Sequence, residues 1–276
     1  MKDFENKVAA ITGAGSGIGR GLAINLAREG CHLAVSDVNE EGLSETVSML
    51  ARFPVRTTSH VVDVSSREQV HYYADEAARE HGGVNMIFNN AGVGLGDNLA
   101  MVSYEDLEWI FGINLWGVIY GTKAFLPYLW KADEGYVINV SSVHGMFTNP
   151  YVGPYCTTKF AVRGFTETLW QELKGSSVGV SCVHPGGIKT GIARSARIVR
   201  SPDGRVSSEE AAEDFDKIAR TSADKAAKII LKGVSKNKKR ILVGADAHIM
   251  DFLLRMFPVR FTKVMAGKLD PSHISL

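Results

Sequence analysis

Short apolar segments alternate with longer amphipathic segments along most of this chain. The apolar runs are KVAAITG, HLAVSDV, TTSHVVDV, VNMIFNN, GYVINVSS and VGVSCVHP, with RILVG nearer the C-terminus. The segments between them carry apolar residues at helical spacing, as at Leu22, Ala23, Leu26 and Ala27. Strands that are apolar nearly throughout and separated by helices indicate a parallel sheet with helices on both faces. The sequence therefore predicts an α/β fold with a doubly wound parallel sheet.

No internal repeat, low-complexity tract or flexible linker divides the 276 residues, so we expect one domain over residues 1–276. Two stretches break the alternation. Residues 190–222 show no clear strand and are predicted to be an insertion that forms a loop or lid near the substrate. Residues 246–276 form a C-terminal tail that is apolar with three basic residues in its segment DAHIMDFLLRMFPVRFTKVM. The tail could close a pocket, pack on a partner subunit, lie on a membrane surface or simply pack against the domain.

Composition excludes several classes of partner. The formal net charge is +1, from 31 basic and 30 acidic residues, which argues against nucleic acid as a partner. The three cysteines form no C-x-x-C pair, so we expect neither a disulfide framework nor a metal site. No run approaches the roughly eighteen apolar residues of a membrane span, and the N-terminal residues lack the apolar core of a signal peptide. These features predict a soluble, cytoplasmic protein.

A glycine-rich turn follows the first predicted strand. Thr12–Gly19 reads TGAGSGIG, and its glycines fit G-x-x-x-G-x-G with Gly13, Gly17 and Gly19. The G-x-G-x-x-G pattern is not met, because Ile18 occupies the position of its third glycine. A turn free of Cβ atoms lets the backbone approach a pyrophosphate, and the helix that follows supplies N–H donors and the positive end of its dipole. The turn predicts a Rossmann-like dinucleotide site.

An acidic residue ends the second predicted strand. Asp37 lies eighteen residues after Gly19, about where a ribose-binding carboxylate belongs. A carboxylate there accepts a hydrogen bond from a ribose 2′-hydroxyl and repels a 2′-phosphate, which favours NAD over NADP. Arg20 leaves NADP open, because a guanidinium beside the turn could instead bind the 2′-phosphate.

A phenol and an ammonium group lie one helical turn apart in the stretch YCTTK. Tyr155 and Lys159 at i and i+4 share one helix face. A unit charge about 4 Å away at an effective dielectric near 20 contributes about 4 kcal/mol, enough to lower the pKa of a phenol by roughly three. An oxidised nicotinamide would add a second positive charge. A phenol tuned in this way can exchange a proton with an alcohol or carbonyl while hydride moves. Ser141 and Ser142 end a predicted strand at the edge where ligands of such sheets bind, and one hydroxyl could bond the substrate oxygen.

Together these motifs resemble the short-chain dehydrogenase/reductase family, in its form with a single cofactor-binding domain. TGAGSGIG is similar to the family's T-G-x-x-x-G-x-G turn, NNAG (89–92) to its motif after the fourth strand, and YCTTK to its Y-x-x-x-K. The resemblance runs from about Val8 to Gly244. It implies that Tyr155 is the acid/base, that Ser142 rather than Ser141 is the catalytic serine, and that Lys159 binds the nicotinamide ribose. It also implies a catalytic role for Asn114, whose main-chain carbonyl is expected to hold a relay water.

The resemblance implies further contacts to the cofactor. The residues expected to contact it are Gly13, Ser16, Gly17, Ile18, Gly19, Asp37, Asp63, Val64, Asn90, Ala91, Gly92, Tyr155, Lys159, Pro185, Gly186, Ile188 and Thr190. Family members commonly form tetramers or dimers through the helices that carry Asn114 and Tyr155. The resemblance therefore implies a homotetramer or homodimer here.

The substrate is the least constrained part of the sequence. By the resemblance, substrate-facing positions fall on Val93, Leu95, Met146, Phe147, Tyr151, Val152 and the stretch IARSARIV. His144 could contact a polar group of the substrate or be a structural histidine. This mainly apolar lining favours a bulky hydrophobic secondary alcohol or ketone. We therefore expect an NAD-dependent oxidoreductase that interconverts such a pair by hydride transfer.

Two alternatives to this function stay open. An NADPH-dependent ketoreductase acting on acyl thioesters would suit Arg194, Arg197 and Arg200, which otherwise form a solvated basic face. A dinucleotide-binding regulatory or scaffold protein could instead use the apolar tail to dock on a partner or a membrane.

Overall fold

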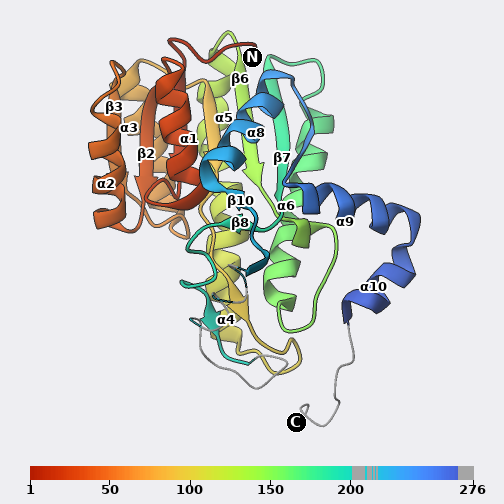
Figure 1. Ribbon diagram of the computed structural model, residues 1–276. Helices are drawn as coiled ribbons and strands as arrows, with labels where there is room; N and C mark the ends of the chain where they lie inside the picture. Colours follow the sequence, from red (N-terminus) through yellow and green to blue (C-terminus); the bar gives the residue numbers. More distant parts are fainter. Residues whose placement is uncertain (201–208, 210–212, 214, 216, 267–276) are drawn as a thin grey trace.

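The carboxyl ends of seven parallel strands meet at one edge of a single sheet in the computed structural model of the protein (Figure 1). The structure describes residues 1–200, 209, 213, 215 and 217–266. The strand order is β11-β7-β6-β4-β1-β2-β3. The strands are β1 (Val8–Thr12), β2 (His32–Asp37), β3 (Thr57–Val61), β4 (Met86–Asn89), β6 (Gly135–Val140), β7 (Val178–Pro185) and β11 (Arg240–Val243). This is the parallel sheet that the alternating pattern predicts.

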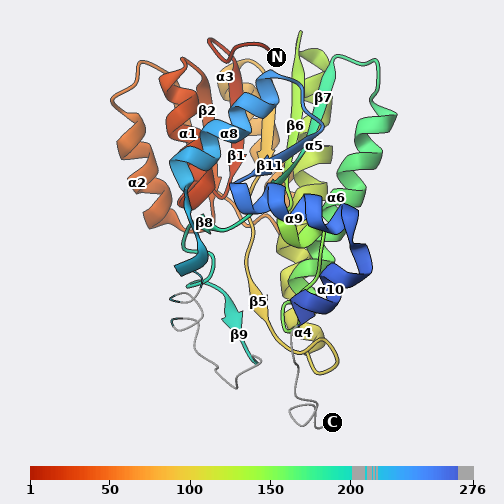
Figure 2. The same ribbon diagram turned by 45° about the vertical axis from the view of Figure 1, so that its right-hand side comes forward.

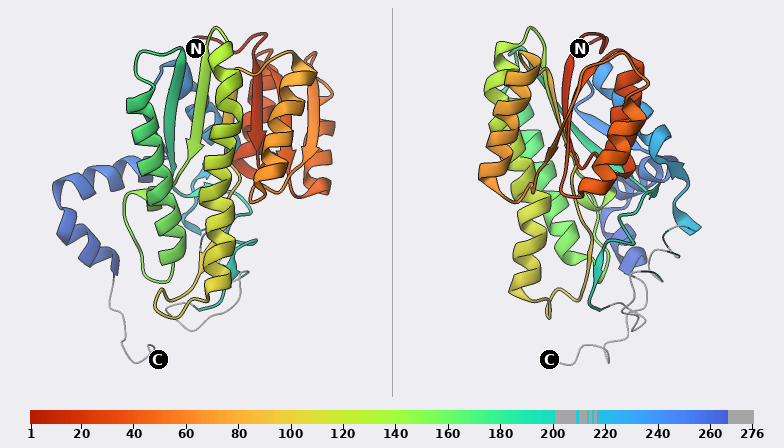
Figure 3. Two further views of the ribbon diagram at one scale, coloured as in Figure 1. Left: turned by 180° about the vertical axis from the view of Figure 1, so that it is seen from behind. Right: turned by 90° about the vertical axis from the view of Figure 1, so that its left-hand side faces the viewer.

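Helices cover both faces of the sheet. One face carries α1 (Gly17–Arg28), α2 (Glu40–Leu50) and α8 (Ala223–Ser235), which are in front in Figure 1. The other face carries α3 (Arg67–His81), α5 (Gly117–Lys131) and α6 (Gly153–Glu172), which are in front in the left view of Figure 3. The side chain of Ile11 joins the core under α1 and α8, whereas that of Ala10 joins the core under α3 and α5. Both faces of β1 are therefore buried, which explains its uninterrupted apolar sequence.

Side-chain caps fix the starts of several helices. The Asn39 side chain accepts a hydrogen bond from Gly42 N at 3.0 Å at the start of α2, and Ser66 accepts from Gln69 N at 3.3 Å at the start of α3.

The helix α4 (Tyr104–Phe111) continues without a break through the π-helical turn η1 (Gly112–Trp116) into α5. A π turn inside a helix often marks a functional position, and this one contains Asn114.

The predicted insertion at residues 190–222 contains short strands that its sequence did not indicate. The strand β9 (Arg197–Ile198) pairs in parallel with β5 (Leu95–Gly96), below the main sheet in Figure 2. The strand β10 (Thr221–Ser222) pairs with β8 (Ile188–Lys189), which directly precedes the insertion. Through the pairing of β9 with β5, residues 197–198 of the insertion contact the chain segment that follows β4. Residues 201–208, 210–212, 214 and 216 of the insertion lie outside the described residues.

The C-terminal tail begins as two helices, α9 (Ala245–Met256) and α10 (Pro258–Ala266). They project from the sheet beside β11, at the level of its carboxyl edge (Figures 1 and 2). Their inner side packs in a small core that includes Ala247 and Phe261. No helix among the described residues is long and apolar enough to cross a membrane. Residues 267–276 of the predicted tail lie outside the described part of the chain.

Candidate active site

The glycine turn between β1 and α1 has a backbone that only glycine adopts readily. Gly13 and Gly17 have φ of +67° and +51°, in the left-handed region. A Cβ atom on Gly19 would lie 2.0 Å from the carbonyl oxygen of Gly13. Ser16 is the exposed N-cap of α1 and makes no side-chain cap hydrogen bond, and the first N–H groups of a helix have no partner within it. The turn therefore fits the pyrophosphate of a dinucleotide.

Asp37 lies directly against this turn. Its Oδ2 accepts a hydrogen bond from Gly15 N at 2.8 Å, and its Oδ1 accepts one from Asn39 N at 2.9 Å. The side chain is partly exposed at the carboxyl end of β2. The carboxylate is thus fixed by the backbone on both sides, and it keeps capacity to accept further hydrogen bonds. It occupies the position that the sequence predicts for a ribose-binding acid.

Arg20 is engaged within the fold. Its Nε donates to Thr46 Oγ1 at 2.9 Å, and its Nη2 lies 2.7 Å from Glu45 Oε2. Nη2 also donates to Gly42 O at 3.1 Å and to Gly15 O. These contacts tie α1 and the glycine turn to α2. The possibility that Arg20 binds a 2′-phosphate is therefore not favoured by its geometry.

Thr12 joins the glycine turn to the segment after β4, a role that sequence reasoning missed. Its Oγ1 accepts hydrogen bonds from the backbone N–H groups of Asn90 and Ala91 at 3.0 and 3.1 Å. The Asn90 side chain returns a hydrogen bond to Thr12 O at 2.9 Å. Thr12 is the first letter of the TGAGSGIG motif, so the signal was present in the sequence.

Asp63 and Val64 follow β3 beside the same edge of the sheet. Asp63 Oδ1 accepts from the backbone N–H and hydroxyl of Ser65 at 2.9 and 2.7 Å. Val64 is buried, and a Cβ on Gly117 would lie 2.9 Å from its Cγ2. The contact of these two residues with adenine stays a prediction.

The segment after β7 closes over the glycine turn from the other side. Pro185 ends β7, Gly186 N donates to Val243 O at 2.9 Å, and Ile188 is buried in the core. A Cβ on Gly17 would meet the Thr190 methyl group at 3.1 Å. The predicted cofactor residues at Gly17 and Thr190 are therefore neighbours in space.

Asp246 supports this segment. Its Oδ2 accepts from Gly187 N at 2.6 Å, and a Cβ on Gly186 would lie 2.1 Å from the same oxygen. No pattern in the sequence links Asp246 to a glycine so far away in the chain, and this residue too was missed.

The residues of the predicted catalytic set come together at the carboxyl edge. Tyr155 and Lys159 lie on α6, with Lys159 Nζ 5.5 Å from the centroid of the Tyr155 ring. The buried Lys159 Nζ donates to Val140 O, at the end of β6, at 3.2 Å. A Cβ on Gly92 would lie 3.3 Å from the same Nζ. The lysine therefore reaches the space beside the turn after β4, where a cofactor ribose is expected.

The two neighbouring serines have different roles. Ser141 Oγ donates to the backbone carbonyl of Lys159 at 2.8 Å and so joins β6 to α6. Ser142 Oγ accepts from His144 N at 3.1 Å, and its interaction with Tyr155 lowers the pKa of the phenol. This supports the assignment of Ser142 rather than Ser141 to the site. Behind it, the Nδ1 of the buried His184 lies 3.0 Å from the Ser142 carbonyl oxygen, a support that sequence reasoning did not identify.

The expected effect of Lys159 on the tyrosine requires correction. Burial raises the pKa of Tyr155 to about 12, and only the hydrogen bond from Ser142 opposes that rise. Burial also lowers the pKa of Lys159 to about 8. Desolvation is the largest cause of both shifts. Lys159 by itself therefore does not bring the phenol near neutrality.

Asn114 lies in the π turn η1 and is fully buried. Its Oδ1 accepts from Val93 N at 2.8 Å, and its Nδ2 donates to Val93 O at 2.9 Å. The side chain thus fixes the backbone just after the NNAG motif. Its main-chain relay to Lys159 stays a prediction.

The positions expected to face the substrate divide into two groups. Val93, Leu95, Tyr151 and Val152 lie on the segments around β5, where Asp97 N donates to Tyr151 O at 2.8 Å. Met146 and Phe147 do not belong with them, because they pack in the core formed with Ala247 and Phe261. The sequence-based assignment of these two to the substrate site is corrected accordingly.

His144 lies between the two groups. Its ring centroid is 6.0 Å from that of Tyr155, in an edge-on arrangement, and 5.0 Å from that of Phe147. Burial lowers the pKa of His144 to about 4, so the ring is neutral near neutral pH. It can therefore contact a substrate without introducing a charge.

Two arginines of the insertion bind within the chain. Arg197 lies 3.1 Å from Asp106 Oδ1, with its guanidinium over the Trp109 ring at 3.7 Å. Arg200 Nη1 lies 2.8 Å from the buried Asp97 carboxylate. These contacts hold residues 197–200 against β5 and α4. The two side chains are still 49% and 39% exposed, so they combine these contacts with the solvated basic face that the sequence suggested.

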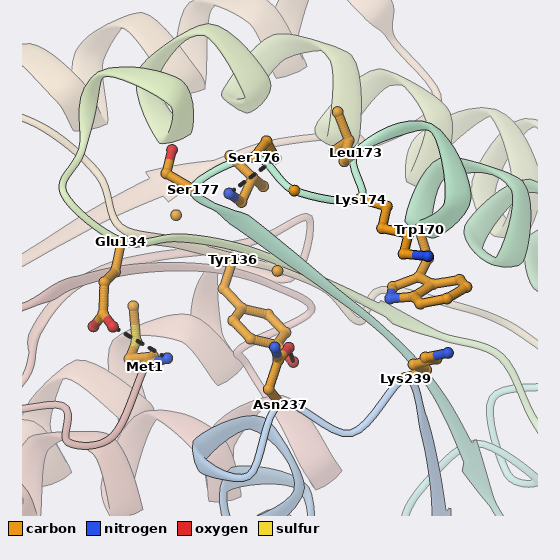
Figure 4. A pocket seen from close by; sticks show the side chains of 14 residues that line it. Met1, Glu134, Tyr136, Trp170, Leu173, Lys174, Ser176, Ser177, Asn237 and Lys239 are labelled. Atoms are coloured by element: carbon orange, nitrogen blue, oxygen red, sulfur yellow. Dashed lines mark hydrogen bonds and ion pairs between the residues drawn. The ribbon is translucent and has the colours of Figure 1, made fainter.

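A cavity of about 390 Å³ lies at the opposite, amino-terminal edge of the sheet (Figure 4). The first residues of β6 and β7 line it, together with Trp170, Asn237 and Lys239. Lys239 Nζ lies 3.3 Å from the centroid of the Trp170 indole. None of the predicted site residues lines this cavity.

A dinucleotide turn at the carboxyl edge of a doubly wound sheet, beside a hydroxyl, a phenol and an ammonium group, defines a nicotinamide-dependent oxidoreductase. Residues 7–200 match the family described as short chain dehydrogenase. The chain belongs to this family.

Several relatives match most or nearly all of the chain. The putative oxidoreductase SadH of Mycobacterium tuberculosis is 42% identical over 270 residues, covering 97% of this chain and 96% of the relative. Estradiol 17-beta-dehydrogenase 11 of Rattus norvegicus is 30% identical over 272 residues, covering 98% and 86%. The 3-oxoacyl-[acyl-carrier-protein] reductase FabG of Thermotoga maritima is 33% identical over 209 residues, covering 73% and 85%.

A solved structure extends the match to the whole fold. The short chain dehydrogenase/reductase from Burkholderia phymatum in complex with NAD is 32% identical. It covers all of both chains, with a TM-score of 0.84.

Proposed function

We propose that this protein is an NAD-dependent dehydrogenase that interconverts a hydrophobic secondary alcohol and its ketone, with Tyr155 as general acid/base. The observation that carries the cofactor preference is the pair Asp37 and Arg20. Asp37 is fixed at the turn with acceptor capacity to spare, and Arg20 is held by Thr46, Glu45 and Gly42. A ribose 2′-hydroxyl suits this arrangement, whereas a 2′-phosphate meets a carboxylate and no free guanidinium from Arg20.

The proton step follows from the positions of three side chains. As the phenolate, Tyr155 takes the proton of the alcohol in oxidation, and as the phenol it gives that proton to the ketone oxygen in reduction. Ser142, whose interaction with Tyr155 lowers the pKa of the phenol, binds the same substrate oxygen. Lys159 holds a positive charge between Val140 O and the ribose position. A dinucleotide whose pyrophosphate is bound at the glycine turn would supply, in its nicotinamide ring, the carbon that accepts or donates the hydride.

The raised pKa of Tyr155 means that its phenolate needs additional positive charge nearby. Since burial raises the pKa of Tyr155 to about 12, a phenolate needs more positive charge than Lys159 provides in the protein alone. The oxidised nicotinamide carries such a charge. We therefore infer that the tyrosine becomes an effective base only in the complex with the oxidised cofactor.

Two observations support the proposed substrate class. They are the apolar residues that still line the expected substrate site, and the name of one relative. Val93 and Val152 are apolar and partly exposed, and neutral His144 adds no charge. The relative named as an estradiol dehydrogenase supports a bulky apolar alcohol. An acyl-thioester ketoreductase is the second candidate, because FabG is also a relative. The engagement of Arg197 and Arg200 within the chain weighs against it.

We also propose that the protein is a cytoplasmic homodimer or homotetramer. Large apolar side chains are exposed on the helices that carry the catalytic set. Trp116 is 48% exposed, Trp130 51% and Phe160 38%. Association through η1, α5 and α6 would cover them. Sedimentation velocity of the wild type and of a Trp116→Ser, Phe160→Ser variant would test this, because loss of the assembly is expected in the variant alone.

The test of the function has two stages. In the first stage, fluorescence titration with NADH and NADPH should show tighter binding of NADH. In the second stage, hydrophobic secondary alcohols should be oxidised with NAD, and the absorbance of the reduced nicotinamide measures the rate. Tighter NADPH binding would contradict the role of Asp37. Turnover of acyl thioesters alone would replace the proposed substrate with the second candidate.

A further inference from the structure

The outer side of the arm formed by α9 and α10 (residues 245–266) is apolar and exposed. Ile249, Phe252 and Met256 are 59%, 61% and 57% exposed. Their spacing of three and four residues places them in one stripe along α9. Leu253, Phe257 and Val264 extend this apolar surface and are also exposed. Large apolar side chains gathered in this way mark an interaction surface.

The fold itself does not need this stripe. The inner side of the arm holds it to the domain through a separate set of apolar residues. That set is Ala247, Met250, Leu254 and Phe261, in a core with Val143, Met146 and Phe147. Asp251 adds a polar anchor, with its carboxylate 2.8 Å from Arg240 on β11 and 3.1 Å from Arg255. The outer stripe is therefore available for a partner while the arm stays in place.

The charged residues of the arm favour an anionic partner. Its three basic residues, Arg255, Arg260 and Lys263, are all exposed. Arg260 and Lys263 form no ion pair with any residue that the structure describes. Its two acidic residues are partly buried and engaged, Asp246 with Gly187 N and Asp251 with two arginines. The exposed side thus combines apolar and cationic groups.

We propose that this side of the arm docks on the surface of an anionic lipid bilayer. Apolar side chains of an amphipathic helix enter the headgroup boundary, and basic residues beside them are attracted to anionic lipids. Pairing of two copies through this face would bring its basic residues together, which makes a second copy the less suitable partner.

The position of the arm determines which end of the protein would face the bilayer. It projects beside the carboxyl edge of the sheet (Figure 2), and its inner residue Phe261 packs on Phe147, which contacts His144 beside Tyr155. A docked molecule therefore presents the catalytic end to the bilayer. On the proposed function, this would supply an apolar alcohol or ketone directly from the lipid.

Vesicle flotation tests the docking without any substrate. The full chain should float with vesicles of phosphatidylcholine and phosphatidylserine, and less with phosphatidylcholine alone. Phe252→Ser with Met256→Ser should weaken binding about tenfold or more, because two apolar side chains no longer enter the boundary. Arg260→Gln with Lys263→Gln should weaken it about fivefold per charge, and added salt should do the same. Val61→Ser with Tyr72→Ser is the matched control, since both side chains are exposed on β3 and α3.

Absence of flotation, or equal loss in the control, would overturn the proposal. So would arm variants that change the mass in sedimentation velocity without any vesicle binding, because the surface would then be an interface between copies. Cofactor titration and turnover in detergent-free buffer are measured separately. Failure of the proposed function therefore leaves the flotation result interpretable, and the reverse holds as well.

Discussion

The ring of Phe261 in α10 meets the ring of Phe147 edge-on, with the two centroids 5.4 Å apart. Phe147 contacts His144 at 5.0 Å, and His144 lies edge-on to Tyr155 at 6.0 Å. Aromatic pairs of this kind contribute about 0.5–1.5 kcal/mol each beyond the area they bury. The C-terminal arm is thus joined to the proposed acid/base by a continuous series of ring contacts.

This connection predicts that Phe261 positions Tyr155. Phe261→Ala should lower the free energy of unfolding by about 3–5 kcal/mol and lower kcat, because the support behind His144 is lost. NADH affinity should stay nearly unchanged, since the glycine turn lies elsewhere. Steady-state kinetics well below the unfolding temperature would measure this, with the exposed Phe257→Ala as control and Phe261→Leu as a partial rescue. A kcat equal to that of the wild type in a folded Phe261→Ala protein would contradict the connection.

The hydroxyl of Tyr155 is expected to carry the proton step. Tyr155→Phe removes one oxygen from a partly buried ring and leaves the packing intact, so the protein should fold and bind NADH normally. Turnover should fall by at least about 10²–10⁴-fold, the usual contribution of a general acid or base. Single-turnover measurements with NADH bound would show the loss directly. Retained turnover would exclude Tyr155 as the acid/base.

Asp37 offers a test of cofactor preference in which charge and geometry can be separated. Asp37→Ala should weaken NAD binding by roughly tenfold to a hundredfold, the effect of losing a hydrogen bond to a charged group. Asp37→Asn keeps a side-chain oxygen for Gly15 N while removing the charge, so NADP should bind better than it does to the wild type. Titration of both cofactors against both variants would decide. Unchanged preference for NAD in Asp37→Asn would remove the carboxylate charge from this role.

The burial of Lys159 predicts that the free energy of unfolding is lower at neutral pH than at alkaline pH. Its pKa is lowered to about 8 in the folded protein, whereas an unfolded lysine titrates near 10.4. The unfolded chain therefore binds more protons between these values, and stability rises with pH across that window. Below about pH 8 the buried charge opposes folding by up to about 3 kcal/mol, at 1.36 kcal/mol for each pKa unit.

Lys159→Met should accordingly be inactive but more stable than the wild type at neutral pH. The difference should shrink as the pH rises toward 10, because the lysine in the folded wild type is then neutral. Urea unfolding of the two proteins at several pH values would follow it, with the exposed Lys123→Met as control for loss of a surface charge. A Lys159→Met protein less stable than the wild type at every pH would show that the hydrogen bond to Val140 O outweighs the burial of the charge.

Local spacing made much of this fold and site predictable. The alternation of apolar runs and helices identified the sheet, and Tyr155 and Lys159 could be paired because i and i+4 on a helix share a face whatever surrounds them. Gly13 and Gly17 were identifiable for a similar reason, since their positive φ is a property of the turn itself. Such features are decided within a few residues of sequence.

What the sequence did not reveal depends on distant contacts. Met146 and Phe147 follow the catalytic serine closely, but they turn toward Ala247 and Phe261, which no local pattern indicates. Arg20 was open as a phosphate ligand until its contacts with Glu45 and Thr46 were known. The rise in the pKa of Tyr155 in the protein alone was not predictable, because a sequence gives the charge of a neighbour but not the desolvation that opposes it.

The ion pair between Arg200 and Asp97 helps to hold residues 197–200 against the segment around β5. Asp97 is 1% exposed and Arg200 Nη1 lies 2.8 Å from its carboxylate. Arg200→Ala should leave that buried carboxylate unpaired and lower the free energy of unfolding by about 1–3 kcal/mol. KM for the alcohol should rise, because residues 197–200 then lose one of their anchors to β5.

The double variant Arg200→Ala, Asp97→Asn should recover part of the stability, since no uncompensated charge is left in the interior. It should not recover KM, because the connection between the insertion and β5 is still missing. Urea unfolding and steady-state kinetics of the single and double variants separate the two effects. Recovery of both quantities in the double variant would mean that the pair serves only to neutralise Asp97 and does not hold the insertion.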